Sequence, residues 1–233
     1  WESDRLVNPL VEWGLTEAYG YQTEGICVKA ATGIYICKVR LSGLSPQTMY
    51  HYRRYNGATP DVDNVFQTAP LESTPFRFGV WGDSQQETAN PAVSYAIFTD
   101  MAAEVDLGVT VGDIVQDNTY SYFTNPFRKY ACDIFGHQKP FFTAYGNHDE
   151  PFGSLVQKAL QNSGMYSFSF NYGNAHFTCI SYSQLNDGTL PYDGSIDSLP
   201  LDWIQEDLAS DEAQHATWRF LFIHVPPYSE RWI

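Results

Sequence analysis

The chain has 233 residues, of which 43% are hydrophobic and 17% charged, proportions typical of a globular protein with one large or two smaller domains and not of a disordered chain. Its formal net charge of −14 argues against nonspecific nucleic-acid binding, which requires Lys and Arg to neutralise phosphates. No apolar stretch approaches the roughly 20 residues of a membrane helix, so no membrane span is expected.

The first 70 residues carry short alternating stretches that predict an all-β region. A turn at Ala31–Gly33 separates two of the expected strands. Strands are predicted at Trp1–Asp4, Val11–Gly14, Glu24–Ala30, Ile34–Leu41, Met49–Arg54 and Phe66–Pro70.

One segment of this region resembles a known module. Leu44–Tyr50 reads LSPQTMY, similar to the L-x-P-x-T-x-Y corner of fibronectin type III sandwiches. The resemblance implies a β-sandwich in which the tyrosine ties a strand crossing to its backbone. Such a sandwich needs about seven strands and only about five or six are predicted, so we expect at least one strand before Trp1 in a longer polypeptide. The alternative is a small β domain that begins at Trp1.

The four cysteines form no C-x-x-C pair, which makes a structural zinc site unexpected. Cys27 and Cys37 flank the Ala31–Gly33 turn symmetrically, so a hairpin would place them opposite each other. They form either a disulfide or two half-buried thiols. A disulfide would indicate an oxidising compartment, in keeping with a secreted, periplasmic or cell-surface protein.

The polar segment Leu71–Pro75 is the expected boundary between two domains, residues 1–70 and 75–233. Beyond it, apolar strands alternate with helical patterns, which predicts a βαβαβ unit with a parallel sheet. The expected order is a strand at Phe76–Trp81, a helix at Asn90–Met101, a strand at Leu107–Val111, a helix at Tyr120–Phe135 and a strand at Pro140–Tyr145.

The remainder predicts a short helix, a hairpin, a second helix and a final strand. These are expected at Phe152–Asn162, at Tyr166–Asn171 with Ala175–Ser183, at Ser198–Ser210 and at Trp218–His224.

Four of the apolar strands are followed immediately by polar side chains. Gly82 precedes Asp83-Ser84-Gln85, Gly112 precedes Asp113, Gly146 precedes Asn147-His148-Asp149, and His224 ends the last strand. Because ligands of open α/β sheets bind beyond the carboxyl ends of the strands, these side chains should meet in one place. Carboxylate, amide and imidazole groups together predict a metal site.

The order of these motifs resembles the calcineurin-like metallophosphoesterase superfamily, in particular its purple acid phosphatase-like members with an N-terminal fibronectin type III-like domain. The resemblance implies an α/β metallophosphoesterase sandwich core and two metal ions among iron, zinc, manganese and magnesium. It also implies metal-dependent hydrolysis of phosphate esters, as a phosphomonoesterase or phosphodiesterase. The substrate class would be a phosphate-ester small molecule or a nucleotide.

The resemblance also implies a role for each site residue. Asp83 would bind the first metal, Asp113 would bridge the two, and Asn147 and His224 would bind the second. Gln85 stands where many members carry a histidine, and its amide oxygen would be a weaker ligand. The implied catalytic residue is His148, which would contact the phosphate or protonate the leaving group without binding metal.

Two further features depart from the family pattern. Gln116 stands where purple acid phosphatases carry a tyrosine that binds the metal. The colour of an iron-tyrosinate centre is therefore not expected. The chain stops at Ile233, before any G-H-x-H motif, and we expect it to be a fragment lacking a C-terminal part. The alternative hypothesis is a non-catalytic binding or scaffold protein that keeps the fold and has lost its metals. The remaining histidines have no partner motif: His176 is expected to be structural, and His51, His137 and His215 to face solvent.

Overall fold

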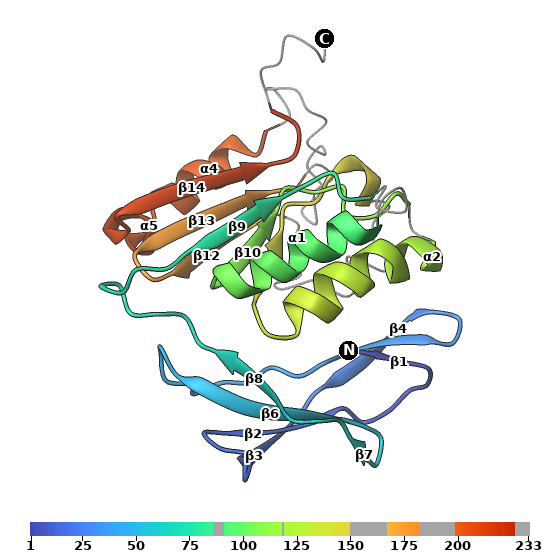
Figure 1. Cartoon of the computed structure of the whole chain (residues 1–233). Coiled ribbons are helices and arrows are strands. Elements are labelled where there is room, and N and C mark those ends of the chain that lie inside the picture. Colours follow the sequence, from blue (N-terminus) through green and yellow to red (C-terminus); the bar gives the residue numbers. More distant parts are fainter. Residues whose placement is uncertain (86–90, 118, 150–166, 182–198, 227–233) are drawn as a thin grey trace.

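The computed structural model describes residues 1–85, 91–117, 119–149, 167–181 and 199–226. Two antiparallel sheets lie at one end of the molecule, and two further sheets flanked by helices lie at the other (Figure 1). None of the described helices is long and apolar enough to span a membrane.

The strands up to residue 70 form two antiparallel sheets. The first has the order β1-β5-β4, and in the second β3-β2-β6-β7 is extended by β8, which pairs with β6. All the predicted strands of this region are present. Two strands were missed, the polar β3 and the two-residue β7. The bounds are β1 Glu2–Ser3, β2 Leu10–Gly14, β3 Gly20–Glu24, β4 Ile26–Ala31, β5 Ile34–Lys38, β6 Met49–Asn56, β7 Thr59–Pro60 and β8 Asn64–Gln67.

A small core rich in aromatic side chains lies against the second sheet, and Trp1 and Val39, which flank β1 and β5 of the first sheet, pack on it. Val11, Trp13 and Tyr50 are buried in it, with Phe66 stacked on Tyr50. The hydroxyl of Tyr50 accepts a hydrogen bond from the backbone N–H of Ser45 at 3.0 Å. This is the contact that the L-x-P-x-T-x-Y pattern predicts.

A disulfide joins Cys27 and Cys37, which face each other across the β4–β5 hairpin. The turn of this hairpin contains Gly33 in the left-handed region (φ 71°), a conformation that glycine adopts without steric cost. Of the two alternatives that the spacing leaves open, the structure shows the cross-link.

The predicted βαβαβ unit is confirmed. Its three strands are parallel and lie in the order β11-β10-β9. The second helix has a kink at Asn125, whose extended backbone suits a residue that precedes proline. The elements are β9 Phe78–Trp81, α1 Pro91–Glu104, β10 Leu107–Thr110, α2 Tyr120–Tyr122, the π-type helix η2 Phe123–Gly136 and β11 Phe141–Thr143.

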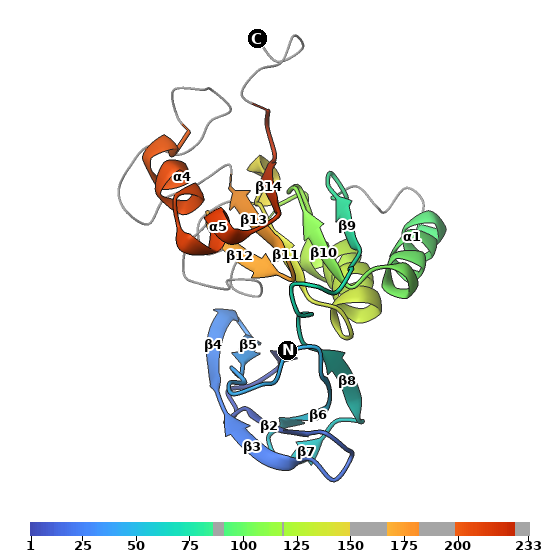
Figure 2. The same cartoon turned by 90° about the vertical axis from the view of Figure 1, so that its left-hand side faces the viewer.

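A second three-stranded sheet packs against the first. Its order is β12-β13-β14, with β13 and β14 parallel, and α4 and α5 lie on its outer side (Figure 2). Leu107 and Val109 from one sheet and Phe177 and Cys179 from the other are fully buried between them. The predicted Phe152–Asn162 helix lies outside the described residues. The bounds are β12 Phe168–Tyr172, β13 Ala175–Ile180, α4 Leu201–Leu208, α5 Asp211–His215 and β14 Trp218–Ile223.

The N-terminal sheets pack directly on helix η2. Ile36 of β5 belongs to the same buried cluster as Phe123 and Phe127 of the helix. Glu2 accepts hydrogen bonds from the hydroxyl of Tyr120 at 2.6 Å and from the guanidinium of Arg128 at 2.8 Å. The two halves of the described chain therefore share an apolar core.

We predict that Tyr50→Phe destabilises the N-terminal sheets by about 1–3 kcal/mol, because the N–H of Ser45 loses its acceptor. Tyr21→Phe is the matched control, since Tyr21 lies on the same sheet and is 59% exposed. Denaturant unfolding measures both variants. Equal midpoints for the two would show that the Tyr50 hydroxyl contributes nothing.

Candidate metal centre

Strands from both sheets of the C-terminal half end at one edge. Trp81, Thr110 and Thr143 lie side by side in register near the ends of β9, β10 and β11. β14 belongs to the opposite sheet, yet its end reaches the same edge, where Nδ1 of His224 lies 2.8 Å from the carbonyl oxygen of Val111. The loops that follow these strands therefore meet.

Three of the predicted metal ligands lie in one cluster. The nearest carboxylate oxygens of Asp83 and Asp113 and a ring nitrogen of His224 lie within 4.8 Å of one another. Nε2 of His224 is 3.4 Å from Oδ1 of Asp113 and 3.1 Å from Oδ1 of Asn147. Asp113 is buried and Asp83 is exposed, so the cluster opens to solvent on the Asp83 side.

The orientation of His224 suits a metal ligand. A backbone carbonyl only accepts, so Nδ1 carries the proton that it shares with Val111. Nε2 then faces the oxygens of Asp113 and Asn147. Acceptor atoms that face one another repel unless a proton or a cation lies between them, and these residues therefore fit a metal ion.

Gln85 gives an independent indication of a cation. Its amide nitrogen donates to Oδ2 of Asp113 at 3.0 Å. Its carbonyl oxygen is buried and has no hydrogen-bond partner in the described part of the chain. A buried acceptor left without a partner costs about 1–3 kcal/mol, which a cation at this position would offset. Gln85 thus lies beside Asp113, another of the residues that the sequence predicts as ligands.

His148 lies at the border of the cluster and is half-buried. Its backbone N–H donates to Oδ1 of Asp113 at 2.9 Å. Nδ1 of its ring is 3.0 Å from the carbonyl oxygen of Gln116, and Nε2 points toward Asp113, with 3.9 Å between Nε2 and Oδ2. The side chain of Gln116 also contacts the ring, at 3.0 Å. His148 is therefore held in one orientation.

Both aspartates have an unusual backbone conformation. Asp83 and Asp113 have φ angles of 54° and 52°, in the left-handed region that few residues other than glycine adopt. A Cβ atom at Gly112 would collide with the backbone nitrogen of Gly146, and one at Gly146 would collide with the side chain of Asp113. The glycines are therefore required for the close approach of the two loops. Strain at such positions is common in functional sites.

Asp149 holds these loops together. Its carboxylate is completely buried and accepts backbone N–H groups of Asp113, Ile114 and Val115 at 2.9, 2.9 and 3.3 Å, and of Gly146 at 2.8 Å. Burial raises the pKa of Asp149 to about 7, against the opposite effect of the backbone N–H groups. This residue fixes the β10 loop, which carries Asp113, to the β11 loop, which carries Asn147 and His148.

The sequence model of calcineurin-like phosphoesterases matches residues 76–233. The chain belongs to this family. The match begins just before β9 and so includes every residue of the cluster.

Similar phosphoesterases are found among plant proteins. Purple acid phosphatases 15 and 23 of Arabidopsis thaliana are each 25% identical to this chain, over 82% and 90% of it. These matches cover 41% and 52% of the relatives, so the chain spans about half the length of the curated relatives it matches.

Two solved structures share the fold. A purple acid phosphatase from yellow lupin (Lupinus luteus) seeds superposes with a TM-score of 0.70 at 18% identity, over 93% of this chain and 46% of its own. PhoD superposes with a TM-score of 0.63 at 16% identity, over 94% of this chain and 55% of its own.

The sequence analysis did not assign roles to two residues that position the candidate metal centre, Asp149 and Gln116. Asp149 is the last residue of the GNHD run, and its partners are backbone groups, which leave no mark in a residue pattern. The predictions for the remaining histidines are partly wrong. His176 is buried and bonded to Asp207 and Asn171, as expected of a structural residue. His51, however, is half-buried and paired with Asp63, and His137 is half-buried as well.

We predict that Asp149→Asn lowers the free energy of unfolding by about 3 kcal/mol, because an amide offers one acceptor oxygen to four backbone donors. Asp117→Asn is the control, since Asp117 is exposed and, among the described residues, accepts one backbone N–H, that of Thr119. Chemical denaturation compares the two variants with the wild type. A midpoint for Asp149→Asn no lower than that of Asp117→Asn would contradict the role of Asp149.

Proposed function

We propose that the protein hydrolyses phosphate esters, as a monoesterase or a diesterase, at a dinuclear metal site formed by Asp83, Gln85, Asp113, Asn147 and His224. The observation that carries the proposal is the cluster of acceptor atoms around Asp113, together with the buried amide oxygen of Gln85 that has no partner in the described residues. Family membership and the fold shared with purple acid phosphatases support it.

Each ligand has a distinct place. Asp113 is buried and offers Oδ1 toward His224 and Oδ2 toward Gln85, so its carboxylate can bridge two ions. Asp83 approaches from the exposed side, and Asn147 and His224 lie together on the other. Iron, zinc, manganese and magnesium all accept such oxygen and imidazole ligands.

Two metal ions held here would bind a phosphate group and lower the pKa of a water molecule for attack on phosphorus. His148 is the residue of this chain that we assign to proton transfer. The backbone carbonyl and the side-chain amide of Gln116 both contact Nδ1 and orient the ring, so Nε2 faces the cluster, where it can hold the proton destined for the leaving group. Asp149 maintains the separation of the loops that bear His148 and Asp113.

We further propose that residues 1–70 form a fibronectin type III-like β-sandwich and residues 75–233 the phosphoesterase domain. The Tyr50 corner and the two antiparallel sheets support the first assignment. The Cys27–Cys37 disulfide supports a secreted, periplasmic or cell-surface location, because disulfides persist in oxidising compartments.

The first test is elemental analysis of the full-length protein purified without chelators, followed by assays on p-nitrophenyl phosphate and bis-p-nitrophenyl phosphate. We predict two metal ions per chain at this site and hydrolysis of at least one substrate. Asp113→Asn should lose bound metal and reduce kcat/KM by about 100-fold or more. Asp100→Asn, on the exposed side of α1, is the control for loss of one carboxylate. A protein that contains no metal and stays inactive after incubation with each metal would refute the proposed enzymatic activity. The remaining hypothesis would be a non-catalytic binding protein with this fold.

A second prediction separates catalysis from metal binding. His148→Ala should keep the metal content of the wild type and lower kcat by ~10²–10⁴-fold, since it removes a proton donor and no ligand. Metal analysis and steady-state kinetics on the same preparation measure both. Loss of metal in this variant would show that His148 is a metal ligand. An unchanged kcat would show that His148 takes no part in proton transfer.

A further inference from the structure

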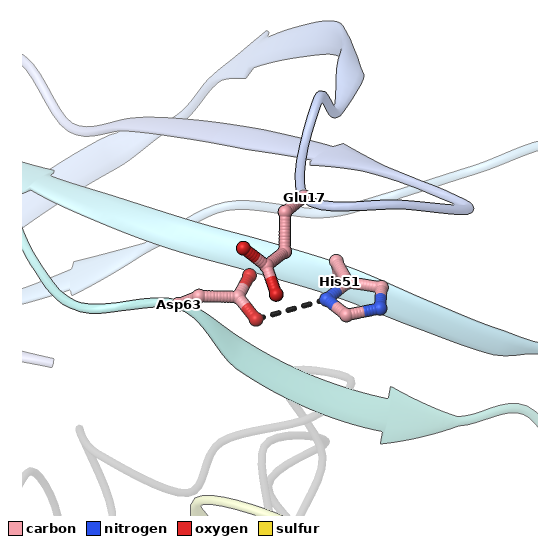
Figure 3. A group of neighbouring side chains, drawn as sticks. All are labelled: Glu17, His51 and Asp63. Atoms are coloured by element: carbon pink, nitrogen blue, oxygen red, sulfur yellow. Dashed lines mark hydrogen bonds and ion pairs between the residues drawn. The ribbon is translucent and has the colours of Figure 1, made fainter.

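A second cluster of ligand-type side chains lies in the N-terminal sheets, among residues outside the phosphoesterase site. It consists of Glu17, His51 and Asp63, and Figure 3 shows the two carboxylates and the imidazole turned toward one another. One ligand atom from each residue lies within 4.8 Å of the others. Nδ1 of His51 and Oδ2 of Asp63 are 2.8 Å apart.

Strand register explains why these three residues meet. His51 on β6 is paired with Gly14 on one side and with Val65 on the other. β2 ends at Gly14, so the turn that carries Glu17 begins next to His51. Asp63 directly precedes β8 and therefore lies on the opposite flank of β6. Three separate segments of the chain converge on one imidazole.

The cluster carries uncompensated negative charge. In the described parts of the chain, His51 is the ion-pair partner of Asp63 and no ion pair is present at Glu17. Arg53 of the same strand already has other partners: it forms an ion pair with Glu12 at 2.6 Å, and its guanidinium lies over the ring of Tyr19, 4.7 Å from the centroid. Two carboxylates beside a single imidazole attract a cation.

One of the carboxylates is already oriented. The hydroxyl of Tyr19 donates to Oδ1 of Asp63 at 3.0 Å, which leaves Oδ2 directed at His51. Metal-binding carboxylates are commonly held in this way by a hydrogen bond to the oxygen that does not face the metal. Tyr19 is therefore a positioning residue for the cluster.

We propose that Glu17, His51 and Asp63 form a binding site for a divalent cation of the zinc class. An imidazole nitrogen and two carboxylate oxygens are ligands that Zn²⁺ accepts, with water in the fourth position. Ligands of one tetrahedral zinc lie roughly 3.4 Å apart. Nδ1 of His51 and Oδ2 of Asp63, 2.8 Å apart, would separate slightly to hold the ion, and exposed Glu17 has an oxygen within 4.8 Å of both. The ion replaces the proton on Nδ1 of His51, and that proton moves to Nε2 or to water. Bound zinc would tie the β2–β3 turn, β6 and the start of β8 together.

The test is a titration of the full-length protein with Zn²⁺, followed by NMR of isotope-labelled histidine side chains. The resonances of His51, identified by their absence in His51→Gln, should shift on addition of zinc. Glu17→Gln and Tyr19→Phe should each weaken this zinc binding by about tenfold. Glu24→Gln is the matched control, because Glu24 is an exposed carboxylate on β3 of the same sheet and lies outside the cluster; it should leave the affinity unchanged.

Two results would overturn the site. One is the absence of a His51 shift in about a hundredfold excess of zinc. The other is equal weakening by Glu17→Gln and Glu24→Gln, which would reduce the effect to general attraction by an acidic surface. The readout reports on His51 alone, so it is independent of whether the phosphoesterase site binds metal.

Discussion

The buried carboxylate of Asp149 makes the hydrogen bonds on which the geometry of the candidate metal centre depends. It accepts N–H groups from both the β10 loop and the β11 loop, so the two loops are cross-linked by a side chain that itself needs no contact with metal or substrate. A charged acceptor enclosed by backbone donors tolerates little movement, because any shift leaves a buried group without a partner. The hydrogen bonds of Asp149 therefore fix the relative positions of Asp113, Asn147 and His148.

The glycines and the left-handed aspartates are a consequence of the same packing. The loops approach so closely that Gly112 and Gly146 cannot carry a side chain, and the turn after each strand places Asp83 or Asp113 in a conformation that the residue would not adopt alone. The protein thus maintains a locally unfavourable backbone where the carboxylates have to converge.

The architecture of the site could be predicted from sequence because three strands are apolar runs that end in glycine and a polar residue, and a fourth ends in a histidine. That pattern located Asp83, Asp113, Asn147 and His224, although not the fact that β14 reaches them from a second sheet. The sequence analysis missed the contacts that depend on the register between paired strands. β3 is polar and becomes a strand through pairing with β2, and His51 meets Asp63 only because β8 aligns beside β6. Such pairings depend on tertiary packing, which local periodicity does not encode.

Because the N-terminal sheets share a core with η2, the first part of the chain also stabilises the helix that packs behind β9 and β11. Ile36, in the hairpin closed by the Cys27–Cys37 disulfide, packs among the aromatic residues of a helix whose other neighbours support β9 and β11. A boundary drawn at residues 71–75 therefore divides one hydrophobic cluster. A phosphoesterase domain cut there would expose the apolar face of η2 to water, and contiguous exposed patches of this kind favour aggregation.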